Sequence, residues 1–276
     1  MIVFTDVDGT LYDYQGVLPE SAKTAVKKLK DNGHKVYMVT GRSKAENKEE
    51  LWQMGFDGII CGNGSYIESD GEVIYHKCLR LEECKQIVDW CDERKIGFYE
   101  ESNSGLYASK YFYSVAGKAI AQYKYGKDKN IEGKTENVDD AIHGLIRDGQ
   151  LYREDVNKIS FVLNSQDDYL EAVKRFPDLK VGTWGGKKED AIFGDIGIQG
   201  ADKAKAIAFL LDYLKQDVQN TLAIGDAESD IPMLEYCHIG VAVNSGGEGI
   251  KAMADYITDD VDKDGFYKAM EHFNLI

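Results

Sequence analysis

The order of apolar and amphipathic segments is the feature that most restricts the fold. In the first part of the chain, short apolar segments at 2–5, 35–39 and 58–61 alternate with two amphipathic segments of helical spacing. This order predicts strands of a parallel sheet joined by right-handed helical crossovers. The pattern returns in the last part, with apolar segments at 221–224 and 239–243. The sequence therefore predicts a Rossmann-like, doubly wound α/β core interrupted by an insertion.

Helices are predicted between these strands from the spacing of small and apolar side chains. The first helix follows Pro19 and ends at Gly33, and its apolar residues recur at intervals of three and four: Ala22, Ala25, Val26 and Leu29. A second helix is predicted over 44–54 and a third over 202–215. Helices in these positions cover both faces of such a sheet, and ligands bind beyond the carboxyl ends of its strands.

The insertion follows a hairpin with predicted strands at 66–68 and 73–75. Beyond it, helical and strand patterns are mixed, which is typical of an α+β domain with an open antiparallel sheet. The predicted domains are 1–79 and 193–276 for the core and 80–192 for the inserted cap. Within the cap, helices are expected at 81–94, 112–125, 137–149 and 167–175, and strands at 97–101, 106–109, 159–163, 180–183 and 191–193.

Composition excludes several classes of protein. The 276 residues include 33 Lys and Arg against 48 Asp and Glu, and the formal charge of -15 repels nucleic acid. No apolar run reaches about 18 residues and no secretory signal pattern is seen, which predicts a cytoplasmic protein without a membrane partner. The five cysteines form no Cys-x-x-Cys pair, so neither disulfides nor a zinc site are indicated. A monomer and a homodimer are both compatible with these features.

Two acidic residues follow the first predicted strand directly. Asp6 and Asp8 are separated by one residue and are followed by Gly9 and Thr10. Side chains alternate along a strand, so both carboxylates point into one crevice only if the backbone turns there, and Gly9 permits that turn. Neighbouring carboxylates are unfavourable unless a cation lies between them or only one is ionised. The pattern indicates a functional site, with an acidic surface turn as the alternative interpretation.

Further polar residues are expected at the same edge of the sheet. Thr40 follows the second strand, Lys203 stands at the start of the third helix, and Asp226 and Asp230 follow the strand at 221–224. Together these residue types favour phosphoryl transfer, which requires an in-line nucleophile, a divalent cation and donors around three oxygens.

A role follows for each of these residues. We expect Asp6 to attack phosphorus, and Asp8 to act as general acid and then as general base. Lys203 is expected to offset the assembled negative charge. Thr40 and the Gly41 amide are expected to donate hydrogen bonds to the phosphoryl oxygens.

Mg²⁺ is the expected metal, because hard oxygen ligands and a phosphate suit it. The expected ligands are the Asp6 carboxylate, the Asp8 backbone carbonyl and the Asp226 carboxylate. Asp230, one helical turn further on, is expected to bind a metal-bound water or to hold the other ligands in place.

These residues resemble the four motifs of haloacid dehalogenase (HAD) superfamily phosphatases: Asp6-Val7-Asp8-Gly9-Thr10, Thr40-Gly41-Arg42, Lys203, and Gly225-Asp226 with Asp230 and Ile231-Pro232-Met233-Leu234. The insertion resembles the C2B cap of the Cof-type subgroup. The resemblance implies a Rossmann-like core, Mg²⁺, an aspartyl-phosphate intermediate and substrates such as sugar phosphates or phosphorylated cofactors. Asn63 and Asn244 match positions that line the site in that subgroup, and Gly41 and Arg42 are predicted to bind substrate with them. Arg42 is equally compatible with a surface position.

The predicted function is therefore a Mg²⁺-dependent phosphomonoester hydrolase whose partner is a small phosphorylated metabolite. One alternative is a phosphosugar mutase, which uses the same motifs. Another is a phospholigand-binding regulator with a degenerate site, although a binder has no need of an acid-base residue such as Asp8. Cap residues are expected to contact the leaving group, and the candidates are Lys110, Arg153, Trp184 and Lys187.

Overall fold

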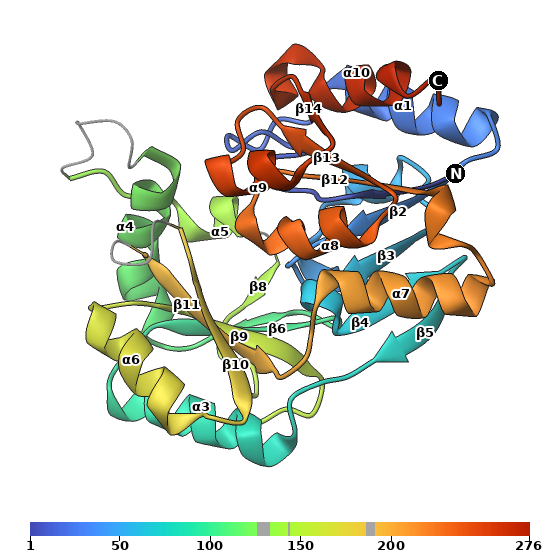
Figure 1. The fold of residues 1–276 in the computed structure, drawn as a ribbon. Helices are drawn as coiled ribbons and strands as arrows, with labels where there is room; N and C mark the ends of the chain where they lie inside the picture. Colours follow the sequence, from blue (N-terminus) through green and yellow to red (C-terminus); the bar gives the residue numbers. More distant parts are fainter. Residues whose placement is uncertain (126–132, 143, 186–190) are drawn as a thin grey trace. The chain divides into compact units, whose positions relative to one another are not determined.

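The computed structural model describes residues 1–125, 133–142, 144–185 and 191–276, and they form two compact units (Figure 1). The core unit contains Met1–Gly41, Lys48–His76 and Asp202–Ile276. The cap unit contains Arg42–Asn47 and Lys77–Ala201. The predicted boundaries differ from this division at residues 42–47, 77–79 and 193–201, all of which lie in the cap unit. Among the described residues, no helix is both long and apolar enough to cross a membrane.

The core unit is built on an eight-stranded sheet of order β14-β13-β12-β1-β2-β3-β4-β5. The strands from β14 to β3 are parallel, and β4 and β5 add an antiparallel hairpin at one edge. The predicted α/β class with a Rossmann-like parallel sheet is thus confirmed. The bounds are β1 (Ile2–Thr5), β2 (Lys35–Val39), β3 (Gly58–Cys61), β4 (Tyr66–Ser69), β5 (Glu72–His76), β12 (Thr221–Gly225), β13 (Ile239–Val243) and β14 (Tyr256–Thr258).

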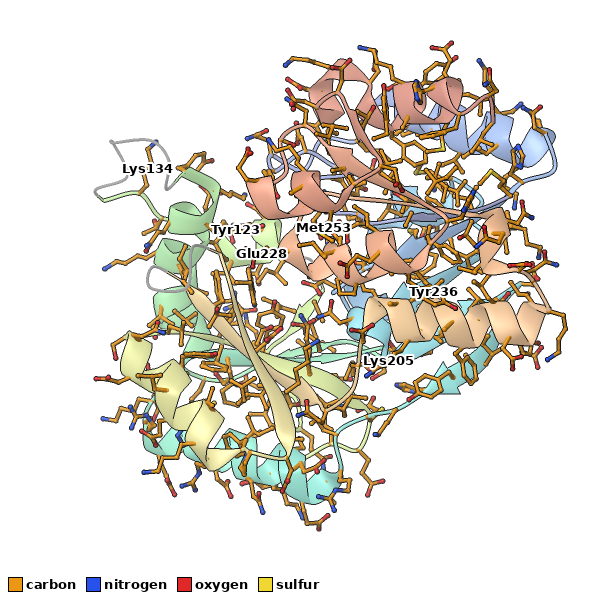
Figure 2. All side chains as sticks on the ribbon, in the orientation of Figure 1. Tyr123, Lys134, Lys205, Glu228, Tyr236 and Met253 are labelled. Atoms are coloured by element: carbon orange, nitrogen blue, oxygen red, sulfur yellow. The ribbon has the colours of Figure 1, made fainter. Side chains whose placement is uncertain are left out.

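Helices cover both faces of the core sheet. On one face, α1 (Glu20–Asp31) and α10 (Gly265–His272) pack apolar side chains such as Leu29 and Phe266 against the strands. On the other face lie α7 (Lys203–Leu214), α8 (Ile231–Tyr236) and α9 (Glu248–Met253), with Ile207 and Leu234 in the core cluster. Polar side chains such as Lys205 on α7 and Tyr236 at the end of α8 point outward (Figure 2). Burial on both faces explains why the parallel strands are almost wholly apolar.

The helix predicted over 44–54 is wrong. The chain instead forms a short 3₁₀ turn, η1 (Lys44–Glu46), and a single helical turn, α2 (Glu49–Trp52). Asn47 and Lys48 between them have extended backbones, and the Asn47 side chain donates to the Ser43 carbonyl at 2.9 Å. Asparagine competes with helical hydrogen bonding in this way, because its side chain offers the backbone another partner.

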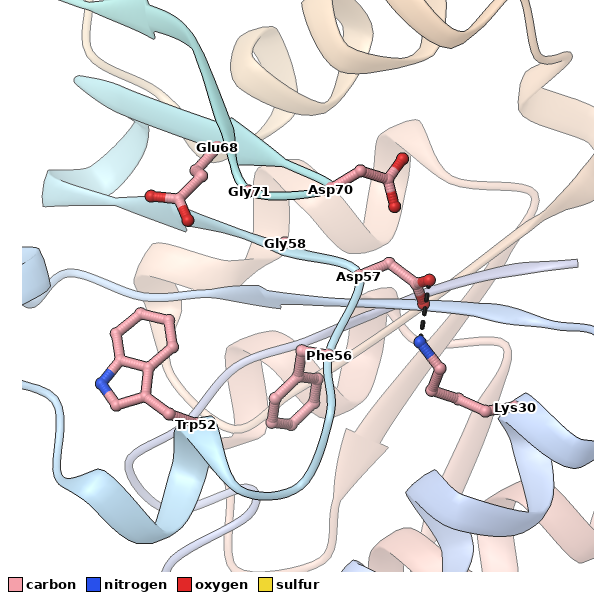
Figure 3. A pocket seen from close by; sticks show the side chains of 8 residues that line it. All are labelled: Lys30, Trp52, Phe56, Asp57, Gly58, Glu68, Asp70 and Gly71. Atoms are coloured by element: carbon pink, nitrogen blue, oxygen red, sulfur yellow. Dashed lines mark hydrogen bonds and ion pairs between the residues drawn. The ribbon is translucent and has the colours of Figure 1, made fainter.

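A cavity of about 280 Å³ lies at the amino end of β3, beside the turn between β4 and β5 (Figure 3). Trp52 and Phe56 line one side of it, and the remaining lining residues are Lys30, Asp57, Gly58, Glu68, Asp70 and Gly71. Two of its acidic residues form ion pairs within the protein, since Lys30 pairs with Asp57 at 2.9 Å and Lys35 pairs with Asp70 at 3.1 Å. Because ligands of doubly wound sheets bind at the carboxyl ends of the strands, this cavity is not the expected site.

The cap unit contains a six-stranded sheet of order β10-β11-β9-β6-β7-β8. All neighbouring pairs are antiparallel except β7 and β8. α3 (Leu81–Glu93) and α6 (Gln166–Arg175) contribute to the apolar cluster on one face, whereas α4 (Phe112–Tyr125) and α5 (Val138–Ala141) contribute to the cluster on the other. The strands are β6 (Phe98–Ser102), β7 (Leu106–Ala108), β8 (Leu145–Ile146), β9 (Val156–Val162), β10 (Leu179–Trp184) and β11 (Phe193–Ile198).

Two predicted cap elements are corrected. The helix expected over 137–149 ends at Ala141, and Gly144 and Asp148 take positive φ angles of 78° and 55° on either side of β8. β11 begins at Phe193, where the predicted strand was to end, and it pairs with β9 and β10. The strand was not predicted in full because it contains glycines, which are uncommon in strands. Gly194 is nevertheless required, because a Cβ there would lie 2.3 Å from the Phe161 ring.

A buried acid in the cap unit makes stability depend on pH. Glu100 on β6 is fully buried, its Oε1 accepts from the Cys84 thiol at 3.3 Å, and burial raises the pKa of Glu100 from 4.5 to about 8. The folded state therefore holds a proton that the unfolded state loses above pH 4.5, so stability falls between about pH 4.5 and 8.

We expect Glu100→Gln to reduce this loss. At 1.36 kcal/mol per pKa unit, Glu100 alone contributes a loss on the order of 4 kcal/mol between pH 4.5 and 8.5. Urea unfolding at both pH values, followed by tryptophan fluorescence, measures it, with the exposed Glu93→Gln as the matched control. An unchanged pH dependence in Glu100→Gln contradicts the assignment.

Candidate active site

Asp6 lies where β1 leaves the sheet. Its backbone N–H continues the parallel ladder by donating to the Ile224 carbonyl of β12 at 2.9 Å, and its side chain is buried. The turn after it depends on Gly9, which has a φ of +83° and whose Cβ, if present, would lie 2.3 Å from Asp226 Oδ2. Any larger residue there displaces the Asp226 carboxylate. The Asp-x-Asp-Gly order thus brings β1 and the end of β12 together.

Lys203 is the first residue of α7 and is almost completely buried. Its ammonium donates to Asp6 Oδ1 at 2.7 Å and to Asp230 Oδ1 at 2.5 Å. The Asp202 side chain caps the helix by accepting from the Lys205 N–H. Close packing supports this start of α7, because a Cβ on Gly64 would lie 2.6 Å from the Asp202 carbonyl oxygen. Lys203 therefore links two carboxylates that are far apart in the sequence.

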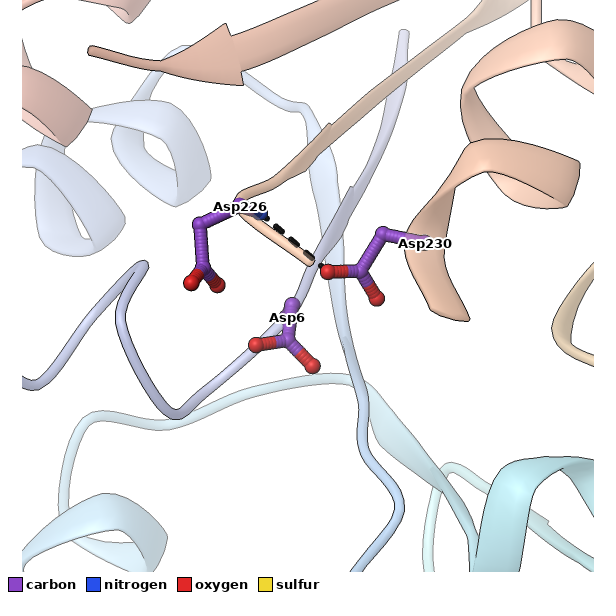
Figure 4. Close-up of side chains that lie close together, drawn as sticks. All are labelled: Asp6, Asp226 and Asp230. Atoms are coloured by element: carbon purple, nitrogen blue, oxygen red, sulfur yellow. Dashed lines mark hydrogen bonds between the residues drawn. The ribbon is translucent and has the colours of Figure 1, made fainter. Parts of the chain in front are cut away.

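Asp226 and Asp230 follow β12 on the turn that leads into α8. Figure 4 shows their side chains converging with that of Asp6. Asp230 Oδ2 accepts the backbone N–H groups of Asp226, at 3.2 Å, and of Ala227, at 3.0 Å. Both oxygens of Asp230 are thus bound within the protein, and this residue holds Lys203 and the turn in place.

Asp6, Asp226 and Asp230 are buried together, and burial changes the pKa values of Asp6 and Asp226. Burial raises the pKa of Asp6 well above its usual range, the nearby Asp230 adds to the effect, and Lys203 opposes it. Burial likewise raises the pKa of Asp226 to about 6, against the hydrogen bond from Tyr14. Burial disfavours the Lys203 ammonium, but Asp230 and Asp6 outweigh it and raise the lysine pKa. A bound cation would allow all three carboxylates to ionise.

The residues present fit a divalent cation. One oxygen from each of Asp6, Asp226 and Asp230 lies within 4.8 Å of the others. Within the described part of the chain, three carboxylates against the ammonium of Lys203 leave two formal negative charges in a buried place. Carboxylate oxygens are the ligands that Mg²⁺ prefers, with waters and a phosphate completing its coordination.

Thr40, Gly41 and Asn63 lie together at the ends of β2 and β3. The Thr40 N–H donates to the Ile60 carbonyl at 2.8 Å, and its own carbonyl accepts from the Asn63 N–H at 3.1 Å. A Cβ on Gly41 would lie 3.2 Å from Asn63 Oδ1, so the amide side chain faces this glycine. Since β2 is the neighbour of β1, the three predicted residues stand at the strand end beside that of Asp6.

Three other predicted site residues are placed differently. Asp8 is half-buried on the turn after Asp6. Arg42 belongs to the cap unit, where it donates to the Glu46 carbonyl at 3.3 Å. The Asn244 side chain donates to Asp260 at 2.9 Å rather than to one of the three carboxylates. The roles predicted for these residues remain predictions.

Sequence analysis missed two hydroxyl groups that contact Asp226. Thr10 donates to its Oδ1 at 3.1 Å, and Tyr14 donates to its Oδ2. Thr10 lies within the first motif, so its position was an available signal. Tyr14 carries no such signal, because it lies in the irregular segment between β1 and α1.

A polar cluster on the cap sheet was also missed. Lys158 on β9 lies 3.3 Å from Glu101 Oε1 on β6 and 3.7 Å from Asp195 Oδ2 on β11. Ser160 donates to the same Glu101 oxygen at 2.6 Å, while Glu101 Oε2 is buried without a hydrogen-bond partner among the described residues. Burial raises the pKa of Glu101 to about 8.

The predicted cap candidates have other contacts. Lys110 pairs with Asp92 at 3.2 Å, and Arg153 pairs with Asp155 at 2.7 Å. Trp184 stacks on Phe193 with ring centroids 4.0 Å apart. Lys187 lies outside the described residues.

Comparison with known proteins accounts for this arrangement. A model of the haloacid dehalogenase-like hydrolase family matches residues 3–270. The chain belongs to this family. Its identification from sequence as a Cof-type HAD phosphatase is confirmed.

Individual relatives of this HAD protein are also phosphatases by name. The chain is 27% identical to the putative phosphatase YkrA of Bacillus subtilis, covering 100% of this chain and 98% of that protein. It is 24% identical to the 5-amino-6-(5-phospho-D-ribitylamino)uracil phosphatase YitU of B. subtilis, covering 99% and 98%. The structure of the HAD subclass IIB sugar phosphatase BT4131 is 25% identical, with a TM-score of 0.76 over 100% of this chain and 99% of that one.

Proposed function

We propose that this HAD phosphatase is a Mg²⁺-dependent phosphomonoester hydrolase of small phosphorylated metabolites, acting through an aspartyl-phosphate on Asp6. The observation that carries the proposal is the buried Asp6 carboxylate, held at Oδ1 by the Lys203 ammonium at 2.7 Å beside two further carboxylates. One hydrogen-bonded oxygen fixes the orientation of the group, so the other is aimed without further loss of conformational freedom.

Asp8 is proposed to move the protons. It follows Asp6 by two residues on the Gly9 turn and is only half-buried, so solvent can reach it. In the first step it gives a proton to the departing alkoxide, and in the second it takes one from the water that attacks the phosphoenzyme. Thr40 and the Gly41 N–H, at the end of the neighbouring strand, are proposed to donate to the phosphoryl oxygens.

Asp6, Asp226 and the Asp8 carbonyl are proposed to hold Mg²⁺, with Asp230 in support. When bound, the ion supplies Lewis-acid stabilisation of the transferring phosphoryl group. Lys203 complements it by favouring the ionised form of Asp6, against the effect of burial, and Thr10 orients Asp226.

The proposed substrates are phosphate esters of sugars, polyols or cofactors. Two relatives support this class by their names, since one is a sugar phosphatase and another acts on a phosphoribityl compound.

Phosphate release from a panel of sugar, polyol and nucleotide phosphates, with p-nitrophenyl phosphate as reference, tests the proposal. We expect turnover with Mg²⁺ and its loss on addition of a chelator, restored by excess Mg²⁺. Product analysis of sugar phosphates separates hydrolysis from transfer to another hydroxyl of the sugar. Failure of every ester to release phosphate with Mg²⁺ present contradicts the proposal.

A further inference from the structure

Tyr14 covers one oxygen of Asp226. Its hydroxyl donates to Oδ2, while the Thr10 hydroxyl donates to Oδ1. Both oxygens of this carboxylate therefore accept hydrogen bonds from neutral hydroxyl groups of the same segment, which joins β1 to α1. The ring of Tyr14 is 47% exposed, so its hydroxyl reaches inward from the surface.

The loop that carries Tyr14 is held together by its own hydrogen bonds. Asp13 Oδ1 accepts the N–H groups of Gln15, at 2.9 Å, and Val17, at 2.8 Å. The Asp13 N–H donates to the Val17 carbonyl at 3.0 Å, and Gly16 turns the chain with a φ of +80°. These bonds close a small loop around Asp13, and Tyr14 is presented by that loop rather than by a helix or strand. Its attachment to the core can change without disturbing the sheet.

We propose that Tyr14 is a positioning residue that acts as a reversible cover on Asp226, competing with the divalent cation for Oδ2. A hydroxyl proton and a cation both draw on the lone pairs of that oxygen, so we expect a cation bound at Oδ2 to weaken or displace the Tyr14 hydrogen bond. The cover satisfies a buried carboxylate while the cation is away and lowers the affinity for it. Of the proposed function, this inference requires only that a divalent cation binds at Asp226.

The expected size of the effect follows from the strength of the bond. A hydrogen bond to a charged group contributes more than one between neutral groups, and its loss corresponds to roughly a tenfold change in affinity or more. Tyr14→Phe keeps the ring and removes the hydroxyl. We expect this variant to bind Mn²⁺, used as the probe cation, about tenfold more tightly than the native chain.

Isothermal titration calorimetry with Mn²⁺ at pH 8 measures the difference. Tyr213→Phe is the matched control, because Tyr213 is 48% exposed and its hydroxyl donates to Glu72 at 3.5 Å rather than to Asp226. We expect the control to bind Mn²⁺ as the native chain does. Unchanged or weaker binding by Tyr14→Phe overturns the inference.

Hydrogen exchange gives a second measurement on the native chain. Once Tyr14 leaves Asp226, the amides of Gln15 and Val17 lose the anchor of their loop, so saturating Mn²⁺ should accelerate their exchange. Slower or equal exchange contradicts the cover.

The two proposals fail in different ways. Tighter Mn²⁺ binding by Tyr14→Phe without any phosphate release supports the cover and contradicts the hydrolase. Metal-dependent release with equal Mn²⁺ affinity in both chains supports the hydrolase and overturns the cover. A native chain that binds no Mn²⁺ contradicts the cover and the metal dependence, while phosphate release still reports on the hydrolysis itself.

Discussion

Asp6→Asn is expected to lower phosphate release at least about 10⁴-fold, because the amide cannot attack phosphorus and no aspartyl-phosphate forms. The change is nearly isosteric, and the amide oxygen can still accept from Lys203, so the fold should persist. Initial rates with the best ester of the panel and saturating Mg²⁺ measure the effect. Circular dichroism and urea unfolding establish that the variant is folded.

Two further variants serve as comparisons for Asp6→Asn. Asp212→Asn, on the exposed surface of α7, removes a charge of the same kind and should leave the rate unchanged. Asp8→Asn should slow both proton transfers yet leave the nucleophile intact. Acid quenching during turnover should therefore trap covalent phosphate on the Asp8→Asn variant, but not on the Asp6→Asn variant. Phosphate release by Asp6→Asn within tenfold of the native rate excludes Asp6 as the nucleophile.

Lys203→Met is expected to cost about 3–5 kcal/mol of stability at pH 8, because it leaves buried carboxylates without their ammonium partner. Methionine fills a similar volume, so the loss reports charge rather than packing. Without Lys203, protonation of Asp6 is the remaining way to remove the repulsion. The pKa of Asp6 is raised in the folded chain, so the deficit should grow as the pH rises from 5 to 8.

Urea unfolding at the two pH values measures this deficit, with Lys205→Met as control. Lys205 is two residues further along α7, and its side chain is exposed (Figure 2). Millimolar Mg²⁺ should recover part of the stability lost by Lys203→Met, since a cation among the carboxylates replaces the missing charge. Equal stability of the Lys203→Met and Lys205→Met variants contradicts the electrostatic role.

Much of the core followed from local sequence. Runs such as Ile2–Thr5 and Lys35–Val39 lie in a sheet covered on both faces, and burial on both sides makes an apolar run the signature of such a strand. The convergence of Asp6, Asp226 and Asp230 followed from the same topology, because parallel strands end at one edge. Lys203 alone would more often be a solvated helix residue, and its place between the cap and the Asp226 motif supported its inclusion.

The missed features depend on contacts between distant segments. β11 contains two glycines and appears irregular until Phe161 covers Gly194. Glu101, Lys158 and Asp195 meet because three strands pair in one register, and no local spacing predicts that register. The Tyr14 hydrogen bond likewise requires the exact path of an irregular loop. Tertiary contacts, rather than local preferences, determine all three.

The chain leaves the core after His76 and returns at Asp202, immediately before Lys203. The lysine that pairs with Asp6 and Asp230 therefore lies at the re-entry point, while the long segment Lys77–Ala201 supplies none of the four charged groups. We therefore expect an insert of another length or fold between these two junctions to leave the cluster unaltered. In engineering terms, the scaffold separates a constant reactive module from an exchangeable one.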